Sequence, residues 1–165
     1  NVYVKIPITD TNGNSTAPLL RKLVAQNVKV NVTAILTIEQ IVPLVEILRD
    51  GPAAYVSVFA GRIADAGVDP LPIMREAVAM LACCSNVELI WASPREVFNI
   101  VQADDIGCHV ITVTYDLLKK VNVLGKDLAE FSLDTVRMFR TDAVKAGFSL
   151  RTEVLARTAA AGRLG

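Results

Sequence analysis

The sequence predicts an α/β protein of the (β/α)8 TIM-barrel class, with about five βα units forming a partial barrel. Five short apolar runs alternate with longer amphipathic segments. The runs recur at spacings of roughly 22–33 residues, which is typical of consecutive βα units in a parallel sheet. Their side chains also separate into an apolar face and a polar face. A polar face favours a barrel interior over a sheet that helices cover on both sides.

The predicted strands are runs rich in β-branched and apolar residues, at 2–8, 29–36, 54–60, 87–92 and 108–114. Side chains alternate between the two faces of a strand. One face is apolar throughout and carries Val2, Val4, Ile6, Val30, Val32, Ala34, Ala54, Val56 and Val58. The other face collects the polar residues, and on it we place Lys5, Asn31, Thr33, Ser57, Trp91, Ser93 and His109. His109, early in its strand, is expected to pack in the core.

The predicted helices lie between and after the strands, at 15–27, 38–50, 69–84, 94–106, 115–121 and 132–146. Side chains that accept hydrogen bonds from free backbone N–H groups favour the first residue of a helix. We therefore expect the first three helices to be capped by Ser15, Thr37 and Asp69. Glycine commonly follows the last turn of a helix, and Gly51 and Gly107 are expected to end two of them.

The length predicts an incomplete barrel, because a complete one needs about 200–250 residues. This chain has 165 residues and five candidate strands, and the first strand begins almost at residue 1. We therefore expect residues 1–147 to be the C-terminal portion of a barrel whose first units lie upstream. Residues 148–165 are expected to form a C-terminal tail.

Composition argues against several classes of function. Lys plus Arg and Asp plus Glu number 17 each, so no positive charge marks a partner such as nucleic acid or an anionic membrane. No apolar run reaches the roughly 18 residues of a transmembrane helix. No spacing of His or Cys is typical of a metal site, and no cofactor is expected. The odd cysteine count, Cys83, Cys84 and Cys108, predicts reduced thiols in a cytoplasmic protein.

One strand contains a residue type that strands seldom bury. Lys5 lies between Val4 and Ile6 in the first run. Burying a lysine is costly, and an apolar environment favours the neutral amine that attacks a ketone to form a Schiff base. On the next strand, Asn31 and Thr33 are suited to holding a carbinolamine hydroxyl or a water molecule. A strand lysine more often lies at a sheet edge with its ammonium group in water, and that alternative stays open from this residue alone.

Two arginines follow the third and fourth strands. Arg62 lies in "GRIAD", and Ser93 and Arg95 lie in "WASPRE". The carboxyl ends of parallel strands meet at one rim, so these residues are candidates for a phosphate clamp. Surface ion pairing is the alternative for either arginine, and Asp65 and Asp69 are expected to be loop and cap residues.

Four stretches in order resemble the transaldolases and the related fructose-6-phosphate aldolases. "VYVKIPIT" is similar to the family's Schiff-base lysine strand, and "VNVTAIL" to the next strand. "VSVFAGRI" resembles its Ser-x-Phe-x-Gly-Arg-Ile segment, and "WASPRE" its Ala-Ser-x-Arg segment. "GCHVITVT" and "LDTVRMF" resemble the last strand and the final helix. Pro94 departs from the aromatic residue usual there.

The resemblance implies a class I aldol transfer or cleavage on phosphorylated sugars, without metal or cofactor, as in the pentose phosphate pathway. It implies that Lys5 forms the Schiff base and that Asn31 and Thr33 orient the intermediate and a water. Ser57 would contact the sugar, and the phosphate would be held by Arg62, Ser93 and Arg95. The family's carboxylate and its water-positioning residue lie on strands before the lysine strand.

Two alternatives stay open. The chain is also compatible with a non-catalytic partial barrel that serves as an interaction module, since the first barrel strands are not among these residues. A weaker alternative is another Schiff-base aldolase with an aldehyde-phosphate substrate, against which Asn31 and Thr33 argue. An open five-stranded piece has two unpaired edges, so we also expect a homo-oligomer.

Overall fold

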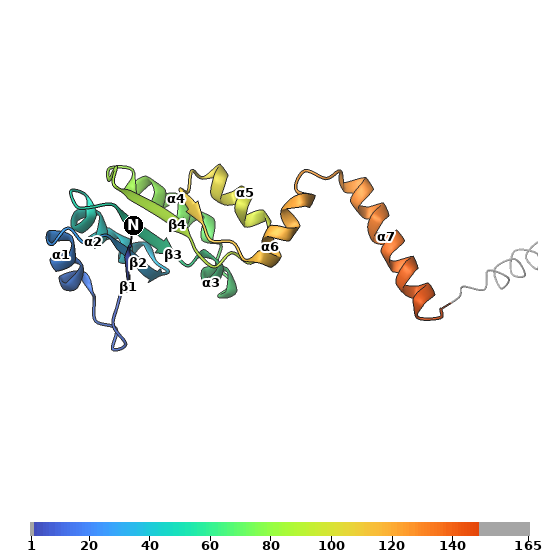
Figure 1. Ribbon diagram of the computed structural model, residues 1–165, viewed down its shortest axis with the longest axis horizontal. Coiled ribbons are helices and arrows are strands. Elements are labelled where there is room, and N and C mark those ends of the chain that lie inside the picture. Colours follow the sequence, from blue (N-terminus) through green and yellow to red (C-terminus); the bar gives the residue numbers. More distant parts are fainter. Residues whose placement is uncertain (1, 149–165) are drawn as a thin grey trace, which may run out of the picture. The chain divides into compact units, whose positions relative to one another are not determined.

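The computed structural model describes residues 2–148, and the chain divides into two compact units, 1–122 and 123–165 (Figure 1). Unit 1 holds every predicted strand and every candidate site residue. Unit 2 contains the last helix. The predicted tail, 148–165, lies outside the described residues except for Phe148.

Unit 1 is a parallel five-stranded sheet in the order β1-β2-β3-β4-β5, which confirms the predicted partial barrel of about five βα units (Figure 1). The strands are β1 (Val4–Pro7), β2 (Val30–Ile35), β3 (Ala54–Val58), β4 (Val87–Trp91) and β5 (Val110–Ile111). The helices are α1 (Ala17–Ala25), α2 (Ile38–Leu48), α3 (Ala60–Asp65), α4 (Pro70–Leu81), α5 (Phe98–Asp105) and α6 (Tyr115–Lys120). A short 3-10 helix, η1, spans Val121–Val123.

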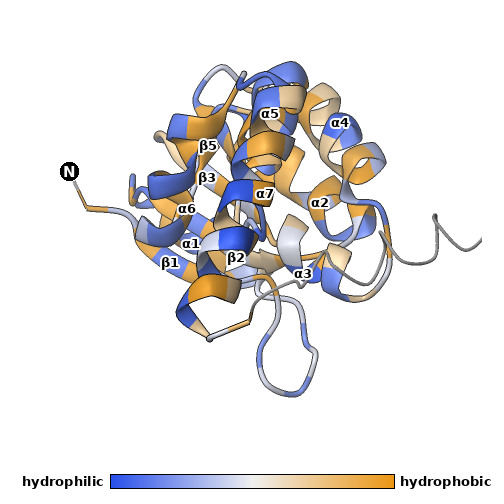
Figure 2. Ribbon diagram, turned by 90° about the vertical axis from the view of Figure 1, so that its right-hand side faces the viewer, coloured by the Kyte–Doolittle hydropathy of each residue, from blue (hydrophilic) through white to orange (hydrophobic). Residues whose placement is uncertain are grey.

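The hydrophobic core lies between one face of the sheet and the helices that return along it. Strand side chains with no exposed surface form the floor of this core: Val30, Val32, Ile35, Val56, Val58 and Leu89. Helical side chains that are equally buried cover them: Leu20, Ile41, Leu44, Leu48, Met74 and Ala77. Figure 2 shows apolar and polar residues alternating along α2 and α4, as expected of helices with one buried face.

The opposite face of the sheet is partly exposed among the described residues, and it carries the polar strand positions. Register partners in one row across β1 to β4 are Lys5, Asn31, Tyr55 and Glu88. Lys5 and Glu88 are exposed, whereas Asn31 and Tyr55 are half-buried. The parity argument therefore holds for Lys5, Asn31, Thr33 and Ser57, which lie on the face opposite to the helices.

Two strands depart from simple alternation. Between Val32 and Ile35 the register of β2 against β3 shifts, and Ala34 adopts a left-handed backbone with φ 61°. Ile35 therefore takes the core position that alternation assigned to Ala34. In β4, Trp91 is the register partner of Val58 and is 1% exposed. Trp91 thus belongs to the helix-covered core. Its predicted placement on the polar face was wrong, because the predicted alternation in β4 was out of register by one residue.

The helix boundaries confirm most of the predicted signals and correct one. Asp69 caps α4, because its carboxylate accepts a hydrogen bond from the Leu71 backbone N–H at 2.9 Å. Thr37 is the N-cap of α2. The N-cap position of α1 is Thr16, while the Ser15 hydroxyl accepts a hydrogen bond from the backbone N–H of Ala17, the first residue of the helix, at 3.2 Å. The Thr16 hydroxyl donates to the Pro7 carbonyl at 2.6 Å, which ties the start of α1 to the end of β1.

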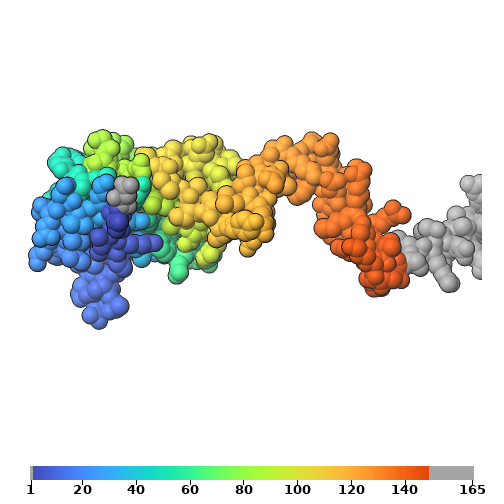
Figure 3. All heavy atoms as spheres, viewed as in Figure 1, coloured from blue at the N-terminus to red at the C-terminus, as the bar shows by residue number. Residues whose placement is uncertain are grey.

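The loop between β1 and α1 projects from unit 1 (Figure 3). Asp10 organises it, since one carboxylate oxygen accepts hydrogen bonds from the backbone N–H groups of Asn12 and Asn14, both at 2.8 Å. These bonds lower the pKa of Asp10, the side chain of Asn14 contributing most. The loop is a self-supported turn of polar residues.

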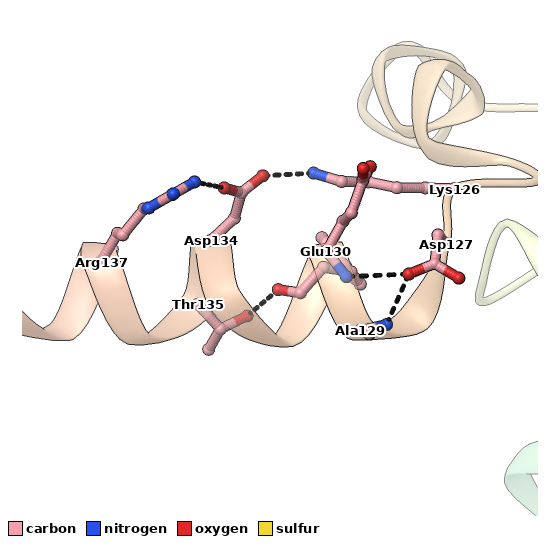
Figure 4. A network of polar contacts seen from close by, with 8 residues as sticks. Lys126, Asp127, Ala129, Glu130, Asp134, Thr135 and Arg137 are labelled. Carbon is pink, nitrogen blue, oxygen red and sulfur yellow. Dashed lines mark hydrogen bonds and ion pairs between the residues drawn. The ribbon is translucent and has the colours of Figure 1, made fainter.

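The described part of unit 2 is dominated by α7 (Leu128–Lys145). It begins four residues before the predicted helix because Asp127 caps it, accepting hydrogen bonds from the backbone N–H groups of Ala129 at 2.9 Å and Glu130 at 3.0 Å (Figure 4). Asp134 pairs with Lys126 and Arg137, and hydrogen bonds from these cations lower its pKa.

Candidate functional site

The candidate site residues form two groups in unit 1. The strand cluster comprises Lys5, Asn31, Thr33 and Ser57, from β1, β2 and β3. The rim cluster comprises Arg62, Ser93 and Arg95, from α3 and the segment after β4. The strand cluster lies within the strands, whereas the rim cluster follows the carboxyl ends of β3 and β4, the end at which barrel enzymes carry their active sites.

In the strand cluster, Lys5 and Asn31 are register partners on adjacent strands. The Ser57 hydroxyl, from the third strand, donates a hydrogen bond to the Asn31 side-chain oxygen at 2.7 Å. Ser57 is buried and Asn31 half-buried. This bond fixes the Asn31 amide so that its NH2 group is left to donate elsewhere.

Lys5 is exposed, in contrast to the desolvated lysine expected from the sequence. The reason is its position on β1, the edge strand of the described sheet, which pairs with β2 alone among these residues. Val2 and Val4 on the same segment are 82% and 41% exposed, so the apolar face of β1 is also incompletely covered. Apolar surroundings for Lys5 therefore require a further layer over this edge.

Thr33 carries a buried hydroxyl that has no hydrogen-bond partner among the described residues. The side chain is 6% exposed and lies one residue before Ala34, whose left-handed backbone makes the shift between β2 and β3. An unpaired buried hydroxyl costs about 1–3 kcal/mol. Such a group is suited to hold a water molecule or a substrate hydroxyl.

Sequence reasoning missed Tyr55 and Glu88, which extend the row of Lys5 and Asn31 across the sheet. The Glu88 carboxylate raises the pKa of Tyr55. The Tyr55 ring also packs against Tyr3, with ring centroids 4.6 Å apart. Aligning the predicted strands with one another, starting from Asn31, would have placed both residues on this face.

His109 is not a core residue as expected. Its side chain is exposed, and its ring nitrogen Nδ1 accepts a hydrogen bond from the Leu89 backbone N–H at 3.1 Å. This bond lies just before β5, which has two residues, Val110 and Ile111, and is shorter than the predicted strand at 108–114. His109 thus supports the start of β5.

The rim cluster is held together by a close backbone contact at Gly61. An added Cβ at this position would lie 1.5 Å from the Ser93 carbonyl oxygen and 3.3 Å from the Arg95 Nε. The Gly61 N–H also donates to the Ala92 carbonyl at 3.3 Å. Only glycine allows this approach. It joins the "GRIAD" and "WASPRE" segments, which are about 30 residues apart in the sequence.

Arg95 forms a two-point ion pair with Asp65, the last residue of α3. Arg95 Nε donates to Asp65 Oδ1 at 3.0 Å, and the other arm of its guanidinium bonds Oδ2. Both side chains are about half exposed. Asp65 is thus not a loop residue as predicted, and its pairing with Arg95 is the surface ion pair that stood as the alternative for this arginine.

A cavity of about 350 Å³ lies beside this pair, lined by Ser93, Pro94, Arg95, Thr112, Val113 and Thr114. Ser93 lines it from a left-handed backbone with φ 59°. Two of the three predicted rim residues therefore share one cavity, whose lining also includes two threonines. Arg62 is exposed one residue beyond Gly61, and its guanidinium lies 5.6 Å from the centre of the Phe59 ring.

Within residues 2–148, no three His, Cys, Asp or Glu side chains are grouped so that they would hold a metal ion. No helix in this described part combines the length and apolar composition that a membrane span requires.

Comparison with known proteins places the chain in a family. A family model described as transaldolase/fructose-6-phosphate aldolase matches residues 1–153. A probable transaldolase of Thermoanaerobacter sp. is 30% identical over 151 residues, which cover 91% of this chain and 64% of that protein. A probable transaldolase of Clostridium kluyveri is 31% identical over 119 residues, covering 72% of this chain and 52% of that protein. The chain thus spans between about half and two thirds of the length of these relatives.

Proposed function

Because the chain belongs to the transaldolase/fructose-6-phosphate aldolase family, we propose that the protein carries out Schiff-base aldol transfer or cleavage on phosphorylated sugars. It would transfer a dihydroxyacetone unit through Lys5, as an enzyme of cytoplasmic carbohydrate metabolism in the pentose phosphate pathway. One observation carries the proposal: within the matched region, Lys5 is the register partner of Asn31, which Ser57 holds from the third strand.

In the proposed reaction, the neutral amine of Lys5 attacks the substrate ketone, and water leaves as the imine forms. The protonated imine then accepts the electrons of the carbon–carbon bond that breaks. The aldehyde product departs, and a three-carbon enamine stays bound to Lys5. Attack of this enamine on an acceptor aldehyde gives transfer, whereas its protonation and hydrolysis release dihydroxyacetone.

Asn31 and Thr33 would bind the water molecule and the hydroxyl group that take part in this reaction. The Asn31 NH2 group would donate to the carbinolamine hydroxyl, since the amide oxygen already accepts from Ser57 at 2.7 Å. The buried Thr33 hydroxyl, unpaired among the described residues, would hold the water that is released and taken up. Ser57, beside Asn31, would contact the sugar.

The rim cluster would bind the phosphate. Arg95 and Ser93 line the cavity of about 350 Å³, and Asp65 keeps the Arg95 guanidinium oriented. Arg62 follows Gly61 on the adjoining turn and would supply the second cation. Arginine guanidinium groups suit the oxygens of a phosphate, which supports the proposal that Arg62 and Arg95 bind it.

We further propose that the 165-residue chain alone has little or no activity and associates with copies of itself. Lys5 is exposed on an edge strand, whereas Schiff-base formation requires apolar surroundings for the amine. The residues that give the family its carboxylate and its water-positioning group lie on strands before the lysine strand. Loss of such general acid–base assistance typically lowers the rate by about 10²- to 10⁴-fold. An unpaired strand edge favours association.

The test is an assay of the complete encoded protein, including any segments that flank these residues. Release of glyceraldehyde 3-phosphate from fructose 6-phosphate is measured with and without an acceptor sugar phosphate. We expect turnover in at least one of the two assays, and none for Lys5→Arg, because arginine stays protonated and forms no imine. A folded protein without turnover in either assay would favour the interaction-module alternative.

A further inference from the structure

A cluster of thiols lies at the end of α4, on residues to which the proposed function assigns no role. Cys83 and Cys84 follow one another in the turn after Leu81, and their sulfur atoms are 3.7 Å apart. Cys83 is exposed, whereas Cys84 is 2% exposed. An accessible thiol therefore touches a buried thiol.

An arginine from another helix contacts the exposed thiol. Arg49, the residue that ends α2, donates a hydrogen bond from its guanidinium to Cys83 Sγ at 3.3 Å. The hydrogen bond from Arg49 is the largest cause that lowers the pKa of Cys83. Exposed thiols beside a cation are the reactive ones in proteins, because the thiolate is the nucleophile.

The other two cysteines have the opposite environment. Burial is the largest cause that raises the pKa of Cys84 and of Cys108. Cys84 Sγ contacts the Val45 carbonyl at 3.7 Å, and Cys108 Sγ contacts the Leu89 carbonyl at 3.4 Å. The chain thus contains one activated thiol and two shielded thiols, one of which is adjacent to the activated one.

We propose that Cys83 and Cys84 form a peroxide-sensitive thiol pair, in which Cys83 is oxidised first and Cys84 then forms a disulfide with it. The Cys83 thiolate attacks hydrogen peroxide, so that an S–O bond forms, the O–O bond breaks and one water leaves after proton transfer. The Cys84 thiol then attacks the sulfenic sulfur, an S–S bond forms, and the hydroxyl leaves as a second water. Two thiols lose two electrons, and one peroxide gains them.

The disulfide would be a reversible state. Adjacent Cα atoms are about 3.8 Å apart, below the roughly 4.4–6.8 Å usual for a disulfide, and such strained bonds are reduced more readily. Forming the disulfide would also break the contact of Cys83 with Arg49 and that of Cys84 with the Val45 carbonyl. These two contacts join the end of α4 to α2. Oxidation would therefore loosen this helix pair.

The test uses the full chain and its own cysteines as controls. At pH 7, limiting iodoacetamide should label Cys83 at least about fivefold faster than Cys108. Arg49→Gln should slow labelling of Cys83 by at least about threefold, with Arg49→Lys restoring part of the rate. Equal labelling of all three cysteines, or a rate unaffected by Arg49→Gln, would overturn the proposal.

Oxidation is then followed by peptide mapping after treatment with hydrogen peroxide. Cleavage after Arg75 and Arg95 leaves both adjacent cysteines on one peptide and Cys108 on another. We expect that peptide to lose two hydrogens, and dithiothreitol to restore it. Cys108→Ser should behave like the parent protein, and Cys84→Ser should leave a sulfenic acid on Cys83 that dimedone captures.

Because Cys84 is buried and its variant is at risk of misfolding, the mass of the parent peptide is the independent readout. A disulfide between two chains through Cys83, or oxidation confined to Cys108, would overturn the assignment.

Discussion

Substitution of Gly61 by alanine tests the contact that assembles the rim cluster. Gly61 lies inside α3, where alanine in place of glycine normally stabilises by about 0.5–1 kcal/mol. Its backbone, however, touches the next segment. The added Cβ would lie 1.5 Å from the Ser93 carbonyl oxygen and 2.6 Å from its carbonyl carbon. Helix propensity and packing therefore predict opposite signs for the change in stability.

Packing should win. Overfilling a closely packed site costs about 1–3 kcal/mol and occasionally more. The displaced Ser93 segment would also weaken the hydrogen bond from Gly61 N–H to the Ala92 carbonyl, worth about 0.5–1.5 kcal/mol. After subtraction of the propensity gain, we expect a loss of about 1–3 kcal/mol in the free energy of unfolding.

The assay is urea unfolding of the 165-residue chain, followed by circular dichroism. A loss of this size corresponds to a midpoint lower by about 1 M, for slopes of about 1–3 kcal/mol per molar urea. Ala64→Gly is the matched control, because Ala64 is exposed in the same helix and reports propensity alone. If Gly61→Ala were as stable as the parent, or more stable, the close contact and the rim cluster built on it would be refuted.

Two further predictions concern the site. Arg62→Gln or Arg95→Gln should raise the KM for fructose 6-phosphate by roughly 10- to 150-fold, because a charge-assisted bond is worth about 1.5–3 kcal/mol, with much less effect on unphosphorylated dihydroxyacetone. Equal losses on both substrates in steady-state kinetics would assign these arginines a structural role. Thr33→Val should raise the free energy of unfolding by about 1–3 kcal/mol, since it removes a buried hydroxyl without a described partner, while lowering kcat. Unfolding and turnover measured together test both effects, and a less stable variant would contradict the first.

Local signals allowed the strands and most helices to be predicted from the sequence. Apolar alternation marked every strand, and Asp69 and Thr37 capped the helices they were expected to cap. The helix α3 was missed because it has six residues and no capping side chain. The start of α7 was missed because Asp127, its cap, precedes a segment with little apolar periodicity.

The errors in the site came from register and from contacts between distant segments. A shift of one residue moves every later side chain to the other face of a sheet. Ala34 makes such a shift by adopting a left-handed backbone conformation. Because this conformation favours glycine over alanine, the residue type at position 34 did not indicate the shift. The placement of Trp91 failed because the pairing of Val58 with Trp91 sets its face. The Arg95–Asp65 pair joins segments 30 residues apart, and neither residue alone signals it.

The proposed chemistry of Lys5 is tested most directly by trapping the imine. The complete encoded protein is incubated with fructose 6-phosphate, reduced with borohydride, digested and mapped by mass spectrometry. Since borohydride reduces an imine to a stable secondary amine, we predict one sugar-derived adduct, on the peptide that contains Lys5, and none in Lys5→Arg. An adduct on another lysine such as Lys29, or no adduct in a protein that turns over, would contradict the account.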